Sequence, residues 1–348
     1  MSLPRAWHIA LVCVFGALLA WSLRPHTPEA GHVARARWLM GTLWTAWAPA
    51  GERAADAQRV GAALDAALDT VASLERRLSN WLPSSELSRL NRSGEAIVSE
   101  PLYAVLDSAC ELAALTGGAF DPTVEALTLA WDLRGSGRTP SESEIETARS
   151  AVDWRRLSLE PSTRRVRLDG VRVDLGGIGK GYALDRAGAV LAALGVRGAE
   201  LDAGGQRWSA GGAPGTTGSS VWVAHPLHRD RGAASVRLAS GSLSTSGQSE
   251  HPGHVLDPRT GRPVATSASV SVGAASGTRA DGLSTSLLVM GRERARAFAD
   301  KHPEIGVLWL EPEADRVEAE AWNLRVVALA PGVRLTRFSH PEPLARIP

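Results

Sequence analysis

A predicted β-hairpin that leads directly into a helix restricts the folds open to this chain. Residues Arg167–Asp174 alternate apolar and polar side chains around an Asp-Gly pair, which favours a type I′ turn between antiparallel strands. A helix is predicted from about Gly181 to Leu194, and Gly195 ends it. Hairpins mixed with helices, with no regular strand–helix–strand alternation and no internal repeat, predict an α+β fold.

Three further helices are predicted from apolar residues at helical spacing and from helix-end signals. They lie over 60–78, from Pro101 to the Gly117-Gly118 pair, and from Ser141, where Glu144 completes a capping box. Further strands are predicted over 221–224, 234–238, 267–272 and 305–310, and a Gly/Ser/Thr loop over 211–220.

The charge composition argues against one class of function, and lysine is unusually scarce within it. With 38 Lys+Arg against 37 Asp+Glu, the formal net charge of +1 argues against a nucleic-acid binder held by bulk positive charge. Only two of the basic residues are lysines, Lys180 and Lys301. The two cysteines, Cys13 and Cys110, provide no disulfide framework or CxxC metal site, so any metal would need oxygen or imidazole ligands.

The N-terminal segment resembles an export signal. The apolar stretch Trp7–Leu23 lies between Arg5 and Arg24, is short for a spanning helix, and lacks a good cleavage site or lipobox. We expect an export signal or uncleaved signal anchor with linker over 1–34, one folded domain over 35–330, and a C-terminal tail over 331–348. The protein would then be periplasmic, with or without an inner-membrane anchor. A buried N-terminal helix is the alternative.

The glycine cluster after the predicted hairpin is a candidate phosphate site. Residues Asp174–Asp185 contain four glycines and Lys180 at the start of a predicted helix. Glycines allow a ligand to approach the backbone, and the N–H groups of a helix start attract phosphate. The spacing matches neither a P-loop nor a dinucleotide-binding turn. A glycine-rich strand-to-helix turn without a ligand is the alternative.

A second cluster contains candidate ligands for a hard cation. If 280–286 is helical, Asp281 and Thr285 face the same way. A carboxylate and a hydroxyl suit Mg²⁺, which completes its shell with water and phosphate. Taken alone, an Asp near a helix start is more often a cap.

Two more clusters carry turn chemistry. One comprises Ser244–Gly247 and His254–Pro263, where His254 would lie at a strand edge as a site residue or a structural one. The other is the loop Gly118–Thr123, in which Phe120 would hold a planar ring or merely support a tight turn.

In this order the clusters resemble the ApbE-like family of FAD:protein FMN transferases, over about Met40 to Gly291. The resemblance rests on several short motifs in register, which are Met40-Gly-Thr42, Ser79-Asn-Trp81, Ser85–Asn91, Gly118–Thr123, Trp131, Asp174–Tyr182, Gly204-Gly205, Thr245-Ser-Gly247, His254–Gly261, and Ala280-Asp281 with Thr285. The family implies an ApbE-like, T-fold-like architecture of mixed, largely antiparallel sheets with packed helices. It also favours the metal-ligand interpretation of Asp281 and Thr285.

The resemblance implies a Mg²⁺-dependent enzyme that transfers the FMN half of FAD to a Thr or Ser hydroxyl and releases AMP. The acceptor would be a flavoprotein with a flavinylation motif, such as a subunit of an NADH:quinone reductase. The implied Mg²⁺ ligands are Asp281, Thr285 and the carbonyl of Gly177, and His254 is the candidate base. The residues implied to line the FAD position are Met40, Trp81, Ala119, Phe120, Asp121, Asp174, Lys180 and Val255.

Some positions depart from the family pattern. The segment Gln248–Gly253 is short, and Gln206 stands where an acidic residue is common, which would affect acceptor binding or transfer. Ser284 and Gly282 replace alanines. Two alternative functions stay open: a Mg²⁺-dependent FAD pyrophosphatase that gives FMN and AMP, and a flavin-binding protein without catalysis.

Overall fold

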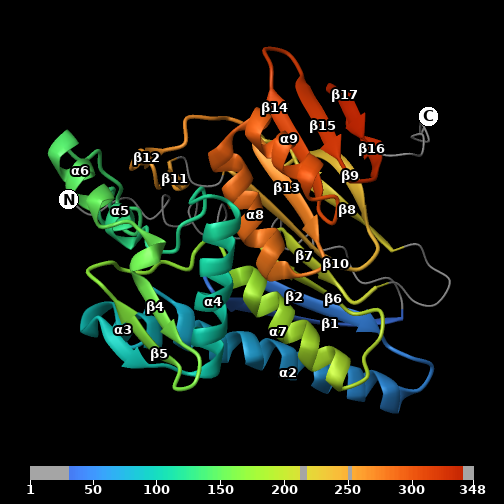
Figure 1. The fold of residues 1–348 in the computed structure, drawn as a ribbon. Coiled ribbons are helices and arrows are strands. Elements are labelled where there is room, and N and C mark those ends of the chain that lie inside the picture. Colours follow the sequence, from blue (N-terminus) through green and yellow to red (C-terminus); the bar gives the residue numbers. More distant parts are fainter. Residues whose placement is uncertain (1–30, 212–217, 250–252, 340–348) are drawn as a thin grey trace, which may run out of the picture.

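The computed structural model describes residues 31–211, 218–249 and 253–339. These residues form one long sheet, three smaller sheets and a layer of helices against the long sheet (Figure 1). The long sheet runs in the order β1 (His32–Leu39), β2 (Thr42–Pro49), β6 (Glu200–Ala203), β7 (Gln206–Ser209), β10 (Gly241–Gly247), β13 (Ser269–Ala274), β14 (Gly306–Pro312), β15 (Val317–Trp322) and β17 (Val333–Ser339).

Neighbouring strands of the long sheet are antiparallel, apart from the parallel pair β15 and β17. The α+β fold with largely antiparallel sheets is therefore confirmed. The smaller sheets are β16 (Val326–Leu329), β9 (Gly232–Leu238) and β8 (Ser219–Ala224); β3 (Glu95–Ile97), β5 (Arg165–Leu168) and β4 (Leu157–Glu160); and β11 (Leu256–Asp257) with β12 (Arg262–Pro263).

Alternation along the strands gives the long sheet two buried faces. On β14, Val307 and Trp309 belong to the core under the helices, whereas Leu308 and Leu310 belong to a second core against β8 and β9. Side chains of a strand point alternately to opposite faces. A strand whose two faces are both buried therefore has a continuous run of apolar residues in its sequence, as β14 does.

Helices α2 (Ala54–Leu78), α7 (Gly179–Ala193), α8 (Gly277–Met290) and α9 (Arg292–Lys301) cover the face of the long sheet that includes the larger core. The other helices are α3 (Glu86–Ser93), α4 (Glu100–Leu115), α5 (Glu125–Ala130) and α6 (Glu142–Ser150), with a 3₁₀ turn η1 (Trp154–Arg156). Of these, α4 packs on α2 and α8, α3 packs on α2, and α5 packs against α6. Helix α7 packs between α2 and α8 (Figure 1). It rests on β7 through Gly188, where an added Cβ would lie 2.3 Å from the Trp208 ring.

Most predicted elements are confirmed. Helices α2, α4, α6 and α7 occur at the expected places, and Ser141 and Glu144 form the predicted capping box. The four predicted strands correspond to β8, β9, β13 and β14. The predicted loop over 211–220 lies mostly outside the described residues, and β8 already begins at Ser219.

The hairpin predicted over 167–174 is wrong. Strand β5 ends at Leu168 and pairs instead with β3 and β4. Beyond the Asp-Gly pair, the Val173 N–H donates to the Asn91 Oδ1 at 2.8 Å, and its carbonyl accepts from the side-chain amides of Asn91 and Asn80, both at 2.8 Å. The side-chain amides of Asn91 and Asn80 thus make the hydrogen bonds to Val173 that a partner strand would make in the predicted hairpin.

The expected domain end at residue 330 is also too early, because β17 (Val333–Ser339) completes the edge of the long sheet. The predicted signal or anchor over Trp7–Leu23 lies outside the described residues, as does most of the expected linker. Among the residues that the structure describes, no helix is both long and apolar enough to cross a membrane.

Candidate functional site

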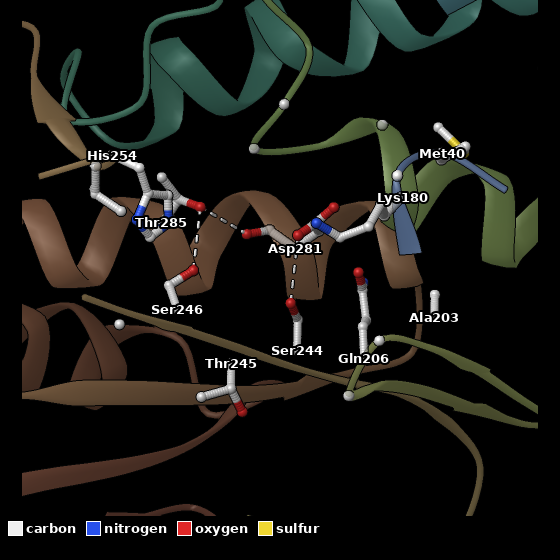
Figure 2. A pocket seen from close by; sticks show the side chains of 18 of the residues that line it. Met40, Lys180, Ala203, Gln206, Ser244, Thr245, Ser246, His254, Asp281 and Thr285 are labelled. Atoms are coloured by element: carbon white, nitrogen blue, oxygen red, sulfur yellow. Dashed lines mark hydrogen bonds between the residues drawn. The ribbon is translucent and has the colours of Figure 1, made fainter. Parts of the chain in front are cut away.

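The predicted site residues surround one cavity of about 930 Å³. It lies where the β1–β2 turn, the segment after α2, the loop after α4, the glycine segment before α7, strand β10 and helix α8 meet. Figure 2 shows this cavity from close by. All of the residues that the resemblance implies line it, namely Met40, Trp81, Ala119, Phe120, Asp121, Asp174, Gly177, Lys180, His254, Val255, Asp281 and Thr285.

Asp281 lies on α8 with its side chain buried beside the start of α7. Its Oδ2 accepts a hydrogen bond from the Gly181 N–H at 2.9 Å, and its Oδ1 accepts one from the Ser244 hydroxyl at 3.3 Å. Burial raises the pKa of this carboxyl, and the positive charge of Lys180 opposes that shift. Asp281 is the fifth residue of α8, and the helix cap is Ser276, so the capping role is excluded.

Thr285 follows Asp281 by one helical turn on the same face of α8, as predicted. Its hydroxyl lies 3.3 Å from the Asp281 carbonyl oxygen and 3.2 Å from the Ser246 hydroxyl (Figure 2). A hydroxyl oxygen has two lone pairs and a single hydrogen. Acceptor capacity therefore remains on Thr285 for a group in the cavity.

Gly177 approaches Thr285 closely because it has no side chain. A Cβ at this position would lie 3.3 Å from both the Thr285 Oγ1 and the Phe120 ring. The donor atoms gathered here are a carboxylate, a hydroxyl and a backbone carbonyl, which are all hard oxygen ligands. Within the described ranges, no group of three or more His, Cys, Asp or Glu side chains forms a metal site. This donor set fits Mg²⁺, which commonly takes few protein ligands and keeps waters and phosphate oxygens.

Lys180 occupies the first turn of α7, where the helix dipole and its own ammonium both favour an anion. Met40 lies nearby in the two-residue β1–β2 turn, and an added Cβ on Gly179 would be 3.8 Å from its methyl group. Met40 has a φ of 49°, which is unfavourable for a residue with a side chain. Its N–H donates to the Glu75 carboxylate at 2.7 Å, which helps to hold this turn in place.

The carboxylates of Asp174 and Asp121 both accept hydrogen bonds from neighbouring groups of the protein. Asp174 accepts from the Gly176 N–H at 2.7 Å and from the guanidinium of Arg134 at 2.6 Å. Asp121 accepts from the N–H and hydroxyl of Thr123, at 2.8 Å and 2.6 Å. Burial raises the pKa of the Asp121 carboxyl. Both residues line the cavity while fixing the loops around it.

His254, Val255 and Trp81 complete the predicted set. His254 is exposed, and Figure 2 draws its ring at the Thr285 end of the cavity. Val255 is buried and its carbonyl accepts from the Val264 N–H at 2.9 Å. The Trp81 side chain is 68% exposed, so it forms part of the cavity rim.

Several lining residues escaped the sequence interpretation. Arg134, Trp38 and Trp222 carry no motif signal, and Ser244 and Ser246 belong to the predicted turn cluster Ser244–Gly247 without a predicted role of their own. Alternation of small hydroxyl residues along 242–246 is the one local signal that indicates a polar strand face toward a helix. Arg134 also binds Glu125, which is 3% exposed and accepts from the Asn80 amide at 2.9 Å.

Gln206, which stands where an acidic residue is common in the resembled family, lies in the cavity wall and is 4% exposed. Its amide nitrogen donates to the Gly277 carbonyl at 3.4 Å, while its Oε1 is buried without a hydrogen-bond partner among the described residues. A carboxylate at this position would have no hydrogen for the Gly277 carbonyl.

Comparisons with known proteins agree on one family. A sequence profile of the ApbE family matches residues 40–309. A Treponema pallidum protein named FAD:protein FMN transferase is 30% identical over 346 residues, and the match covers 90% of this chain and 93% of that protein. The solved structure of the ApbE protein from Thermotoga maritima matches with a TM-score of 0.72 and 29% identity, over 80% of this chain and 94% of that one. The flavin transferase ApbE from Vibrio cholerae matches with a TM-score of 0.72 and 27% identity, over 84% and 97% of the two chains.

Proposed function

This chain belongs to the ApbE family, and from that premise we propose that it is an FAD:protein FMN transferase. The enzyme would attach the FMN half of FAD through a phosphoester bond to a Thr or Ser hydroxyl of a target flavoprotein, and AMP would leave. The observation that carries the proposal is the convergence of Lys180, Asp281, Thr285 and His254 on one cavity. These residues supply the charges and oxygen atoms that phosphoryl transfer requires.

Phosphoryl transfer depends on charge neutralisation and in-line positioning more than on covalent help from the protein. Lys180 and the start of α7 would bind the pyrophosphate of FAD, since both favour negative charge. Asp174 is already paired with Arg134, so its carboxylate contributes little free negative charge to repel the phosphates.

Asp281, Thr285 and the Gly177 carbonyl would hold Mg²⁺, in keeping with their oxygen chemistry. When bound, the ion would supply neutralisation of the charge that develops on the phosphoryl oxygens. Buried Asp281 suits this role, because a buried carboxylate is stabilised by a cation.

His254 would accept the proton of the incoming Thr or Ser hydroxyl. It is exposed and lines the cavity, so a segment of another protein could reach it. An imidazole titrates near neutral pH, which suits a general base. Replacement of His254 by Gln should slow transfer to the acceptor while leaving FAD binding intact.

We place this activity outside the cytoplasm on the strength of the apolar stretch Trp7–Leu23 alone. Fractionation of cells that produce the full chain would test this: recovery of the protein in the cytoplasmic fraction would contradict export. Recovery in the membrane fraction would favour an uncleaved anchor over a cleaved signal.

The decisive experiment is incubation of the full chain with FAD, Mg²⁺ and an acceptor domain that carries a Thr in a flavinylation motif. A gain of one FMN on the acceptor, observed by mass spectrometry, is the expected result. Release of free FMN and AMP would indicate a pyrophosphatase, and recovery of intact FAD would contradict both enzymatic functions. A matched variant is Thr285→Val, which keeps the shape of the side chain and removes its oxygen. This variant should lose metal-dependent turnover.

A further inference from the structure

Two serines of strand β10 contact the two side chains proposed to hold the cation. The Ser244 hydroxyl donates to the Asp281 Oδ1 at 3.3 Å, and the Ser246 hydroxyl lies 3.2 Å from the Thr285 Oγ1. Figure 2 draws both contacts between the strand and α8. The neighbouring residue Thr245 points elsewhere and hydrogen bonds to Ser271 at 2.7 Å.

The spacing of the two elements explains this match. Two residues along a strand advance by about 6.7 Å. Four residues along an α-helix advance by about 6 Å. The distance between Ser244 and Ser246 therefore nearly equals that between Asp281 and Thr285, so Ser244 faces Asp281 and Ser246 faces Thr285.

A third hydroxyl connects the two contacts from the helix side. Ser284 is fully buried, and its hydroxyl lies 2.8 Å from that of Ser246, 3.4 Å from that of Ser244 and 2.9 Å from the Asp281 carbonyl oxygen, which is the nearer of its two acceptors for donation. Each hydroxyl has only one hydrogen to donate. If Ser284 donates to the carbonyl, Ser246 donates to Ser284, and Thr285 can donate to Ser246.

This direction matters for Thr285. A hydroxyl that donates its hydrogen toward the strand turns its lone pairs the other way, as a cation ligand must. Without Ser246, the Thr285 hydrogen would turn to its other partner among the described residues, the Asp281 carbonyl at 3.3 Å. The lone pairs of Thr285 would then no longer be turned away from the strand.

We propose that Ser246 is a positioning residue for the cation site, because it fixes the orientation of the Thr285 hydroxyl; Ser244 does the same for the Asp281 carboxylate. The inference rests on the proposed function in one respect, the assignment of the cation site to α8. Neither serine reacts with the substrate. Partners of metal ligands orient those ligands, and their removal typically weakens metal binding about 10–100-fold.

The test uses Mn²⁺ as a paramagnetic substitute for Mg²⁺, titrated into the full chain without FAD and followed by the EPR signal of free Mn²⁺. Ser246→Ala should weaken Mn²⁺ binding about tenfold. Ser246→Thr retains the hydroxyl and should recover most of that loss. In a Thr285→Val background, Ser246→Ala should change Mn²⁺ affinity by much less, because its effect passes through Thr285.

Ser242→Ala is the matched control. Ser242 lies on the same strand and is fully buried, but its hydroxyl donates to the Arg207 carbonyl at 2.6 Å and contacts neither ligand. Its removal should lower the urea midpoint of unfolding, because the Arg207 carbonyl loses its donor. Mn²⁺ affinity should stay unchanged, which separates loss of orientation from loss of stability.

The outcomes distinguish this inference from the proposed function. If Asp281→Ala abolishes Mn²⁺ binding while Ser246→Ala binds as tightly as the parent, the positioning role is wrong and the site assignment stands. If Asp281→Ala leaves Mn²⁺ binding unchanged, the cation lies elsewhere and the positioning role falls with it. Equal losses in Ser246→Ala and Ser242→Ala would also overturn it. Transfer of FMN to an acceptor is measured separately and does not depend on these results.

Discussion

The contact between the starts of α7 and α8 predicts a large difference between two alanine substitutions only two residues apart. A Cβ on Gly181 would lie 2.1 Å from the Gly277 carbonyl oxygen and 2.7 Å from the Asp281 Cβ. A Cβ on Gly179 would meet only Leu175 and Met40, both at 3.8 Å, which is ordinary van der Waals contact. Gly181→Ala therefore overlaps backbone atoms, whereas the Cβ of Gly179→Ala fits without overlap.

The magnitude follows from this geometry. To reach an ordinary contact, the two helix starts would have to separate by about 1 Å, and close-packed interiors resist such shifts. Overpacking of this kind costs about 1–3 kcal/mol. Both substitutions share the gain of about 1 kcal/mol that Ala has over Gly in a helix. The difference between the variants should thus be about 1–3 kcal/mol, with Gly181→Ala the less stable.

Urea unfolding followed by circular dichroism measures this difference. With an m-value of about 3 kcal/mol/M, the midpoints of the two variants should differ by about 0.3–1 M. Gly181→Ala should also weaken Mn²⁺ binding, because the Gly181 N–H donates to Asp281 at 2.9 Å and would move away with the helix. Coincident unfolding midpoints for the two variants would refute the steric argument.

Three other outcomes can be checked independently. Burial raises the pKa of the Cys110 thiol to about 12, so iodoacetamide at pH 8 should alkylate it far more slowly in the native protein than in urea. Hydrogen bonds from the Ser141 N–H and hydroxyl lower the pKa of Glu144 to about 2, so its stabilising contribution, present above pH ~4.5, is lost as the pH falls toward 2. Glu144→Gln should lack that loss in urea unfolding over the same pH range. Gln206→Met removes the buried Oε1, which has no described partner, but also the donor to the Gly277 carbonyl at 3.4 Å. Because these two effects oppose each other, the unfolding free energy should change by less than about 1 kcal/mol, and a larger loss would contradict the assignment.

Much of the architecture could be predicted because local signals and tertiary structure agree. Helix α2 follows its apolar period, and the buried positions Val60, Leu64 and Leu68 are those that the period selects. The predicted site residues belong to short motifs spread over the chain and line one cavity, whereas the motif Ser85–Asn91 and Trp131 do not line it. Their chemical roles are predictions that the experiments above address.

The hairpin over 167–174 illustrates where local patterns fail. Its alternation and its Asp-Gly pair both favour two strands, but only β5 forms. The partner of Val173 is not a strand but the amide of Asn91, which lies 82 positions away in the sequence. No local pattern contains that information, because an amide side chain satisfies backbone groups as well as a strand does.

The contacts of the β10 serines with α8 could not be predicted for a different reason. Ser244 and Ser246 belong to a strand whose alternation can be read from the sequence, and Asp281 and Thr285 belong to a helix whose period can also be read. What the sequence does not contain is the register of the strand against the helix. That register is set by the packing of α8 on β10 and β13, through contacts distant in the sequence.

The two lysines occupy very different places in the fold, and this gives a physical reason for a lysine at position 180. In a chain with only two lysines, both lie in helices, yet Lys301 is exposed at the end of α9 while Lys180 lines the cavity in the first turn of α7. The neighbouring Gly181 packs against the backbone of α8, so the walls there are close and made of main chain. A slender ammonium can reach an anion in such a place more readily than a broad planar guanidinium. Scarcity drew attention to both lysines, and only the packing of α7 against α8 gives a physical reason for a lysine at one of them.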